Sequence, residues 1–529
     1  MFLPLHSLLP AQAQERPDKV ALEYREKKVS YHDLNLACEH FAGGCQRVGL
    51  PHAARIGVYL PRCIEAVVAF FGALQAGACL VPVNPTLKSQ QASHILEDCG
   101  IEMLVTTSSR LDTLHEALMH DSQLHTVVVI DQEAMPSSDP DQAVRIEGWP
   151  EFCTRSAPAS TDLQDTDLAA IFYTSGSTGL PKGVMLTHKN LRAGAESVTA
   201  YLENTSKDRI LTVLPFSFDY GFSQLSTAFS VGATVVILDY LLPQDILKAI
   251  ERERITGLAG VPALWQQLGR LEWPKAAGET LRYITSSGDV LPETTVRMLT
   301  EKLPATNMYL MYGFTEAFRS TYLPPQEIHR RPTSIGKAIP GAWVQVVHPD
   351  GSPCDPDEVG ELVHGGPLVA QGYWNHSAET GERFRPLAAS PDDSGEAGEV
   401  VAWSGDLVRQ DGDGYFYFVG RKNDMIKTSG YRISPAEIEG PACQHNAVRE
   451  AVAFGVDHPQ RGQSIVLTCT TDQEPAQAEA ELDRYLKDIL PLYMVPEHYV
   501  WADAIPCNDN GKFDRKRLAS QYQANVTGT

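Results

Sequence analysis

The sequence lacks an excess of positive charge. Its 44 lysine and arginine residues are outnumbered by 66 aspartate and glutamate residues, which gives a formal net charge of −22 at pH 7. The pI is near 5.1. Such a chain repels the phosphates of nucleic acids and of anionic membranes, although a local basic patch is compatible with this composition. We therefore expect an acidic globular enzyme that does not bind nucleic acid.

Long apolar runs are also missing. The stretch of lowest charge, 66–85, is interrupted by glutamine, glycine, proline and asparagine, whereas a membrane-spanning helix needs about 20 consecutive apolar residues. It predicts a buried helix followed by a strand, and we expect no stable membrane insertion. The first 13 residues end in an A-x-A pattern but have no basic region. We therefore expect no cleaved secretion signal and a cytoplasmic location.

The ten cysteines show no C-x-x-C pair and no Cys/His spacing typical of a metal site. This distribution favours reduced thiols over a disulfide framework or a zinc site. Hydrophobic residues make up 43% of the chain and charged residues 21%, which predicts a folded protein rather than a disordered one. At 529 residues the chain is too long for one core, so we expect at least two domains.

One stretch, 171–188, stands out as a candidate phosphate-binding loop. It has the sequence I-F-Y-T-S-G-S-T-G-L-P-K-G-V-M-L-T-H, in which an apolar strand leads into a loop of small residues. Glycines let backbone N–H groups converge, hydroxyls add donors and a lysine adds positive charge. The spacing is not that of a P-loop NTPase, which would need glycine where Pro181 stands. The candidate phosphate contacts are Thr174, Ser175, Gly176, Ser177, Thr178, Gly179 and Lys182.

Predicted strands and helices alternate along the first part of the chain. Strands are expected at 55–60 and 79–83, with helices at 63–76 and 90–98, and a polar loop is expected at 132–167. Strands alternating with helices predict an α/β fold with a parallel sheet covered on both faces. No internal repeat of fixed short period appears, which argues against a solenoid.

The second half changes character. Short strands with many Gly and Pro residues at 334–419 predict a small β subdomain, with a hairpin turn at 411–414. A compact α/β module follows, and we place the hinge at Lys422 to Asp424. The expected division is therefore a large N-terminal domain, 1–421, and a C-terminal domain, 422–529.

The motif Y-T-S-G-S-T-G-L-P-K-G-V closely resembles the phosphate loop of the AMP-forming adenylating superfamily. This superfamily contains acyl-CoA synthetases, luciferases and the adenylation domains of peptide synthetases. The resemblance implies layered α/β sheets, a small β subdomain and a mobile C-terminal domain. It also implies ATP and Mg²⁺ as cofactors.

Further segments resemble the superfamily's nucleotide-binding motifs. In the loop Y-G-F-T-E, the resemblance places Tyr312 along the adenine, Thr315 on a phosphate and Glu316 on Mg²⁺, which prefers oxygen ligands. Asp406 matches the ribose-binding aspartate, and Arg421 the adjoining ribose or phosphate contact. Ligands collect at the carboxyl ends of strands in open α/β sheets, so other strand-end residues should face the phosphate loop. The additional expected nucleotide contacts are Gly288, Asp289 and Gly313, with Thr178 as a second metal ligand.

The C-terminal motifs resemble those of two separate half-reactions. N-G-K-F-D-R-K supplies Lys512, the implied catalyst of adenylation, whose charge would stabilise the developing negative charge. I-K-T-S-G-Y-R-I-S-P-A-E-I-E supplies Lys427 and the residues implied to line a pantetheine tunnel. The hinge position, usually Asp or Lys in the family, is Asn423 here. The implied tunnel residues are Gly430, Tyr431 and Arg432.

These motifs together imply an acid–thiol ligase. A carboxylic acid attacks the α-phosphate of ATP to give an acyl-AMP, and a thiol then attacks the acyl carbonyl. We expect no carrier domain after Thr529, so the expected acceptor is CoA or the phosphopantetheine of a separate carrier protein. A luciferase-like oxygenase remains an alternative, because it would use the same adenylation motifs.

The nature of the acid is left open by the residues. The expected acyl pocket contains Phe218, Asp219, Tyr220 and Gly313. The S-F-D triplet resembles amino-acid-activating members, in which the Asp pairs with the substrate ammonium, and a buried carboxylate needs a cation or hydrogen-bond donors. A solvated or helix-capping Asp219 is the alternative. The longer pattern L-P-F-S-F-D-Y-G-F-S-Q-L most resembles acyl-CoA ligases associated with exosortase A systems.

Overall fold

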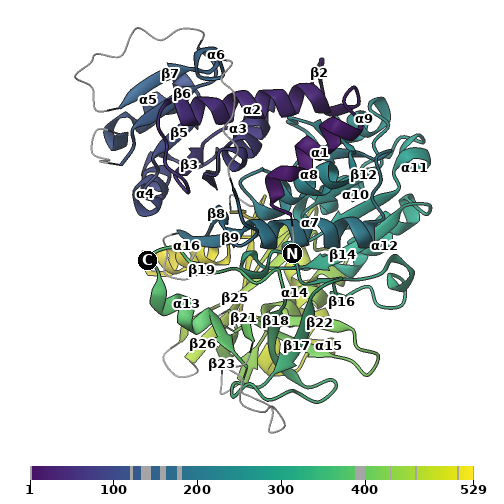
Figure 1. Cartoon of the computed structure of the whole chain (residues 1–529). Helices are drawn as coiled ribbons and strands as arrows, with labels where there is room; N and C mark the ends of the chain where they lie inside the picture. Colours follow the sequence, from purple (N-terminus) through teal and green to yellow (C-terminus); the bar gives the residue numbers. More distant parts are fainter. Residues whose placement is uncertain are drawn as a thin grey trace.

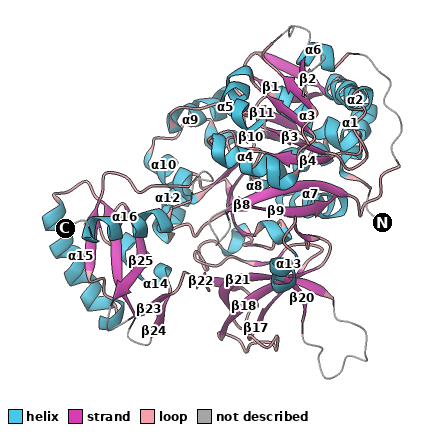
Figure 2. Ribbon diagram, turned by 90° about the vertical axis from the view of Figure 1, so that its left-hand side faces the viewer, coloured by secondary structure: helices cyan, strands magenta, loops and turns pink. Residues whose placement is uncertain are grey.

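The computed structural model describes residues 3–118, 123–132, 144–154, 162–175, 181–387, 399–422, 424–428, 431–458, 462–508 and 512–527. Two mostly parallel sheets with helices packed against them form most of the N-terminal part, as expected for an α/β fold (Figures 1 and 2). A small antiparallel sheet lies below them in both views. The C-terminal region forms a separate sheet with its own helices, to one side in Figure 2.

The first sheet has the strand order β16-β15-β14-β13-β12-β10-β11-β1-β2. Its strands are β1 (Val20–Tyr24), β2 (Lys27–Ser30), β10 (Arg209–Thr212), β11 (Thr234–Ile237), β12 (Gly257–Gly260), β13 (Tyr283–Ser286), β14 (Asn307–Tyr312), β15 (Thr321–Tyr322) and β16 (Lys337–Ala338). The strands from β1 through β14 pair in parallel, whereas β2, β15 and β16 pair antiparallel.

The second sheet has the order β19-β9-β8-β4-β3-β5-β6-β7. Its strands are β3 (Arg55–Val58), β4 (Cys79–Pro82), β5 (Met103–Thr106), β6 (Thr126–Val129), β7 (Arg145–Gly148), β8 (Leu168–Ser175), β9 (Pro181–Thr187) and β19 (Gly372–Tyr373). The strands β8 and β9 pair antiparallel on either side of the candidate phosphate loop. This pairing fixes the two ends of the loop next to each other.

Helices cover the two sheets, and the largest apolar core lies between them. The helices are α1 (Leu8–Glu15), α2 (Tyr31–Arg47), α3 (Ile64–Gln75), α4 (Ser89–Cys99), α5 (Ser108–Leu118), α6 (Trp149–Phe152), α7 (His188–Leu202), α8 (Asp219–Val231), α9 (Pro243–Arg252), α10 (Pro262–Arg270), α11 (Ala277–Thr280) and α12 (Glu293–Lys302), with 3-10 turns η1 (Leu5–Ser7), η2 (Thr315–Ala317) and η3 (Pro325–Glu327). Ser30 caps α2 by accepting a hydrogen bond from the Asp33 amide.

The small β subdomain has the expected short antiparallel strands. It contains β17 (Trp343–Val347), β18 (Val359–Gly365), β20 (Phe384–Pro386), β21 (Val400–Gln410) and β22 (Phe416–Arg421), together with α13 (Ser377–Arg383). The expected hairpin turn joins β21 to β22, where the Gly414 amide donates to the Asp411 carbonyl oxygen at 2.9 Å.

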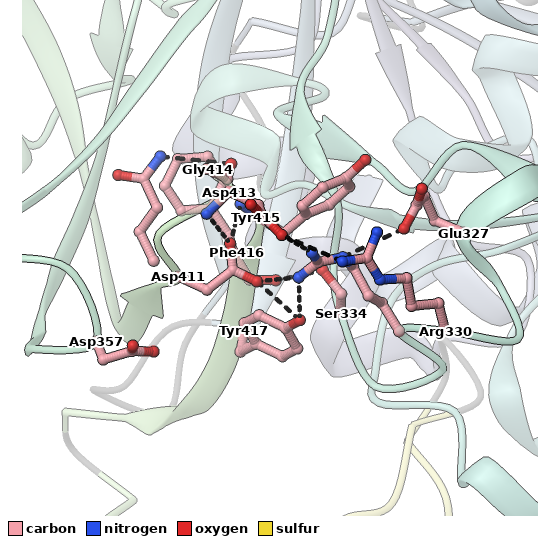
Figure 3. A network of polar contacts seen from close by, with 12 residues as sticks. Glu327, Arg330, Ser334, Asp357, Asp411, Asp413, Gly414, Tyr415, Phe416 and Tyr417 are labelled. Atoms are coloured by element: carbon pink, nitrogen blue, oxygen red, sulfur yellow. Dashed lines mark hydrogen bonds and ion pairs between the residues drawn. The ribbon is translucent and has the colours of Figure 1, made fainter.

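A buried arginine fastens this hairpin to the loop after η3. The guanidinium of Arg331 pairs with Asp411 and Asp413 and lies 4.2 Å from the ring centroid of Tyr415. It also pairs with Glu327 at 3.2 Å. Figure 3 shows Asp411, Asp413 and Tyr415 gathered towards the segment that carries Glu327. This network holds the hairpin through charge-assisted hydrogen bonds.

The C-terminal region is a compact α/β unit. Its elements are β23 (Ile426–Thr428), β24 (Tyr431–Ile433), α14 (Pro435–Gln444), β25 (Glu450–His458), β26 (Gly462–Thr470), α15 (Pro475–Ile489), η4 (Leu492–Met494), β27 (His498–Trp501) and α16 (Arg515–Thr527). It has its own apolar core, separate from that of the two large sheets. The Ser434 hydroxyl donates to the Val419 carbonyl oxygen close to the expected hinge.

Two sequence expectations need correction. The passage 132–167 is not a plain loop, because β7 and α6 lie within its described part. The sequence did not predict these elements, because β7 is only four residues long and two of its residues, in R-I-E-G, are charged. The first predicted strand, 55–60, ends at Val58.

The described residues contain no helix long and apolar enough to cross a membrane. Each of the ten cysteines is free, as the absence of paired spacings predicted.

Candidate functional site

A cavity of about 1510 Å³ lies where the two large sheets, the β subdomain and the C-terminal region meet. It lies at the carboxyl ends of β13 and β14, where an open α/β sheet is expected to bind ligands. The sequence-predicted residues that line it are Thr174, Lys182, Phe218, Asp219, Tyr220, Gly288, Asp289, Gly313, Thr315, Glu316, Asp406, Arg421 and Lys512.

The structure describes the other predicted residues only in part or not at all. For Ser175, Lys427, Tyr431 and Arg432 the backbone is described and the side chains are not. Lys427 pairs with Arg432 in the hairpin of β23 and β24. Neither backbone nor side chain is described for Gly176, Ser177, Thr178, Gly179, Asn423 and Gly430.

The predicted ribose-binding carboxylate is buried and held from two sides. Asp406 is 3% exposed, and the Tyr312 hydroxyl donates to its Oδ2 at 2.6 Å. Arg421 Nε lies 3.3 Å from its Oδ1. Burial raises the pKa of Asp406, and the Arg421 charge and the Tyr312 hydrogen bond oppose that rise. Tyr312 therefore reaches the cavity wall through Asp406.

The predicted magnesium ligand, Glu316, lies beside an arginine and accepts a hydrogen bond from a tyrosine. Glu316 is 8% exposed; it lies 3.4 Å from Arg383 Nη2 and accepts a hydrogen bond from the Tyr373 hydroxyl. Burial alone would raise the pKa of Glu316, but the Arg383 charge and the Tyr373 hydrogen bond leave it lowered. The carboxylate is therefore kept in the ionised form that binds a cation.

The predicted phosphate-binding lysine is paired with a carboxylate. Lys182 Nζ lies 3.0 Å from Glu379 Oε1, on a helix of the β subdomain. This hydrogen bond lowers the pKa of Glu379. A phosphate that bound Lys182 would therefore share the ammonium with Glu379 or displace this carboxylate.

Lys512 enters the cavity from the C-terminal region. Gly288 has a φ of +101°, and a Cβ there would lie 3.4 Å from Lys512 Cε. Burial lowers the pKa of Lys512, as does the Arg421 charge, whereas Asp289 and two other nearby carboxylates oppose this change. Its ammonium has no salt-bridge partner among the described residues, so the charge remains available to a ligand.

Asp219 is buried beside an arginine that the sequence analysis did not single out. It is the first residue of α8 and 5% exposed, which excludes the solvated alternative. Its Oδ1 accepts from the Tyr220 amide at 2.7 Å, and its Oδ2 lies 3.9 Å from Nη1 of Arg319. Burial raises the pKa of Asp219, while Arg319 lowers it. The cation that Asp219 needs is thus supplied by the protein.

The sequence contained a signal for Arg319. It is the charged residue in A-F-R-S-T-Y, an otherwise uncharged run that directly follows the Y-G-F-T-E loop. A charge in the continuation of a strand-end loop points towards the same site as the loop itself. Arg383, Tyr373 and Glu379 carried no comparable signal, because they reach the cavity from β19 and α13, far along the chain.

Comparison with known families gives two matches. The family model "AMP-binding enzyme" matches residues 9–374, and the model "AMP-binding enzyme C-terminal domain" matches residues 437–512. The first match alone covers more than half of the chain.

Curated relatives include peptide synthetases and a CoA ligase. The chain is 32% identical to a linear gramicidin synthase protein of Brevibacillus parabrevis over 99% of its own length, which is 6% of that protein. A second linear gramicidin synthase protein of the same organism is 30% identical over 99% of this chain, which is 10% of that protein. The long-chain-fatty-acid–CoA ligase of Bacillus subtilis is 28% identical over 98% of this chain and 95% of the ligase. The chain thus spans only a small part of the first two relatives.

Solved structures share the fold over the whole chain. ATP-bound MatB from Rhodopseudomonas palustris aligns with a TM-score of 0.86 at 24% identity, covering 99% of both chains. The o-succinylbenzoate CoA synthetase MenE from Bacillus subtilis, in complex with an acyl-adenylate, aligns with a TM-score of 0.82 at 25% identity over 98% of both chains. By its sequence and its fold, the chain belongs to the family of AMP-binding enzymes.

Proposed function

We propose that the protein is an AMP-forming acid–thiol ligase that activates a carboxylic acid with ATP and transfers the acyl group to the thiol of CoA or of a carrier protein. The observation that carries this proposal is the position of Lys512. The C-terminal region brings this lysine into the cavity beside Gly288, where the motif loops of the large sheets converge. This is the arrangement that adenylation requires.

The donor set of the cavity fits ATP. Asp406 is an acceptor-only group that can take hydrogen bonds from ribose hydroxyls once Tyr312 or Arg421 gives way. Lys182 and Arg421 offer positive charge to phosphates. Glu316 would hold Mg²⁺, and the metal when bound would neutralise phosphate charge.

The residues of the chain support the first half-reaction by positioning and charge. The acid approaches from the end of the cavity near Asp219, and its carboxylate oxygen attacks the α-phosphate while pyrophosphate leaves. Lys512 lines the same cavity as Asp219 and Asp406, and the charges of both carboxylates raise its pKa. Its charge would stabilise the negative charge that develops on the transferring groups.

The second half-reaction would use the hairpin of β23 and β24. Lys427 lies on β23, at the start of the C-terminal region, whereas Lys512 lies shortly before α16, near its end. We propose that the C-terminal region turns about Asn423, so that the hairpin replaces Lys512 at the cavity. A pantetheine thiol then attacks the acyl carbonyl, the C–S bond forms, and AMP leaves together with the thiol proton.

Amino-acid adenylation is the second candidate function. It is favoured by the 32% identity to a linear gramicidin synthase protein over 99% of this chain. The argument that Asp219 pairs with the ammonium of an amino acid is weakened by the structure, because Asp219 already has Arg319 as its cation. A substrate ammonium is therefore not needed to explain the burial of Asp219.

A pyrophosphate-release screen over fatty, aromatic, dicarboxylic and amino acids tests the proposal. Acids that release pyrophosphate are then incubated with CoA, and the product is identified by mass spectrometry. An acyl-CoA product supports the ligase. Adenylation of amino acids without any acyl-CoA would support the second candidate, and absence of pyrophosphate release with every acid would contradict both.

A further inference from the structure

Arg319 lies at the acyl end of the cavity with part of its hydrogen-bonding capacity unused. It is 3% exposed and lines the cavity. Its Nη1 donates to the Phe318 carbonyl oxygen at 2.6 Å. Nε and Nη2 are shielded from solvent and have no hydrogen-bond partner within the described part of the chain. A buried charged group in this state is costly, so it calls for an explanation.

The neighbours of Arg319 do not supply the missing acceptors. The ring centroids of Tyr220 and Phe318 lie 4.8 Å and 5.1 Å from its guanidinium carbon. Aromatic faces attract a cation but leave its N–H groups without oxygen acceptors. Asp219 approaches only Nη1, at 3.9 Å, which is too long for a hydrogen bond.

The backbone before Arg319 is strained in a way that holds this geometry. Phe318 has a φ of +56°, a left-handed conformation that is unfavourable for a bulky residue. Gly194 on α7 makes room for its ring, since a Cβ at 194 would overlap the Phe318 ring. Strain of this kind persists where the surrounding structure fixes it, and it concentrates at ligand-binding sites.

Other polar atoms at this end of the cavity are also unpaired. The Ser217 hydroxyl and Gln266 Oε1 line or border the same space and have no partner among the described residues. A long alkyl chain placed here would leave all of these groups without hydrogen bonds. The acyl end is therefore built for a polar group.

We propose, building on the ligase function proposed above, that this end of the cavity selects a compact acid with a second carboxylate. Nε and Nη2 of Arg319 are closed off in the free protein; when the acid binds, the guanidinium turns its Nε–Nη2 edge into the cavity, and the two oxygens of the carboxylate accept hydrogen bonds from it. These two donors form the planar edge of the guanidinium that matches a carboxylate in bidentate fashion. Asp219 lies on the Nη1 side, away from that edge. It keeps the guanidinium in place without occupying the edge.

The experiment compares matched pairs of acids with the wild-type enzyme. Pyrophosphate release is measured for malonic, succinic and glutaric acid against propionic, butyric and valeric acid, with β-alanine and 4-aminobutyric acid as ammonium analogues. At least one diacid should exceed its monoacid in kcat/KM by about 10²-fold or more, because the monoacid leaves Arg319 unpaired.

Two variants locate the preference. Arg319→Gln should reduce the diacid-to-monoacid ratio to near unity. The matched control is Arg331→Gln, which removes an equally buried arginine outside the cavity and should keep the wild-type ratio. Should Arg319→Gln fail to fold, the proposal is tested by the diacid-to-monoacid ratios of the wild type and of Asp219→Asn. Removal of this carboxylate should maintain or increase the diacid ratio.

The outcomes separate this inference from the ligase function. Equal or greater kcat/KM for monoacids or for the ammonium analogues would overturn the diacid preference while leaving the ligase intact. A ratio unchanged in a folded Arg319→Gln protein would overturn the assignment of Arg319. Absence of pyrophosphate release with any acid, including those of the wider screen, would refute the ligase function and this inference with it.

Discussion

Two arginines of this chain are equally hidden from solvent but differ in what they touch. Arg331 is 8% exposed and Arg319 is 3% exposed, and each packs its guanidinium against a tyrosine ring. Arg331 pairs with carboxylates of three residues and with the Tyr417 hydroxyl. Arg319 has one backbone carbonyl and one distant carboxylate.

This difference separates a cation that holds the fold from one that is reserved for a ligand. Asp411 and Asp413, two of the partners of Arg331, belong to the hairpin that Arg331 fastens to the loop after η3, so its charge is used in folding (Figure 3). Arg319 retains two donors in a cavity. Burial alone is therefore a poor guide to function, whereas the number of satisfied donors is a good one.

The largest expected effect concerns Lys512, a cavity-lining cation that has no salt-bridge partner within the described ranges. Lys512→Ala should lower the rate of pyrophosphate release by about 10²- to 10³-fold, because one preorganised charge is lost at a developing anion. Thioester formation from supplied acyl-AMP should fall much less. Lys487→Ala, which removes a half-exposed lysine on α15, is the control. An equal loss in both half-reactions would contradict the assignment.

The pH dependence of adenylation tests the same cation without a mutation. Burial, together with the Arg421 charge, lowers the pKa of Lys512 below the ordinary lysine value of 10.5. The ammonium is present below its pKa and is lost as the pH rises through it. The rate should therefore decline on the alkaline side before pH 10.5, and the profile of Lys512→Arg should extend to higher pH.

Arg331→Met should act on stability rather than on chemistry. Two aspartates and Glu327 would lose their shared cation, so the thermal unfolding midpoint should drop by several degrees. Below that midpoint, kcat for pyrophosphate release should stay close to wild type. A large loss of kcat in the folded variant would remove the distinction drawn between the two arginines.

Lys182 is an intermediate case, a cavity cation paired with a carboxylate. Glu379→Gln should lower the KM for ATP by about 2- to 5-fold, because phosphate no longer competes with a partly exposed carboxylate. Lys182→Met should raise it. An increased KM in Glu379→Gln would show that Glu379 assists nucleotide binding instead of competing with it.

The smallest expected effect is on the pH dependence of stability. Burial raises the pKa of Asp219 above the ordinary 3.8, so the stability linked to its proton is present below that value and is lost as the pH rises through the raised pKa. Asp219→Asn should therefore give a slightly higher urea midpoint than wild type at pH 8. The gain should vanish near pH 4, and a loss at pH 8 would mean that pairing with Arg319 outweighs burial.

Much of the fold and the meeting point of the motif loops could be predicted from the sequence. Strand-end loops are local patterns, and the geometry of a parallel sheet brings their residues to one edge. Gly288 and Glu316, which follow β13 and β14, accordingly line the same cavity. The roles given to them remain predictions.

The rest depends on contacts between distant parts of the chain. Lys182 and Glu379 are 197 residues apart, and no local pattern links them. The unused donors of Arg319 result from a backbone torsion at Phe318 and from a spacing to Asp219 that only the folded chain defines. The short β7 was missed because its charged residues give no apolar alternation.

Because α7 closely approaches Phe318, a residue that does not line the cavity is expected to influence which acid binds. Gly194 is buried and does not line the cavity, yet a single added methyl group there would push the Phe318 ring and turn the neighbouring guanidinium. Engineering that varied only cavity-lining positions would leave this determinant untouched. Under the proposed role of Arg319, position 194 belongs to the residues that determine the acid, and libraries aimed at new acids should include it.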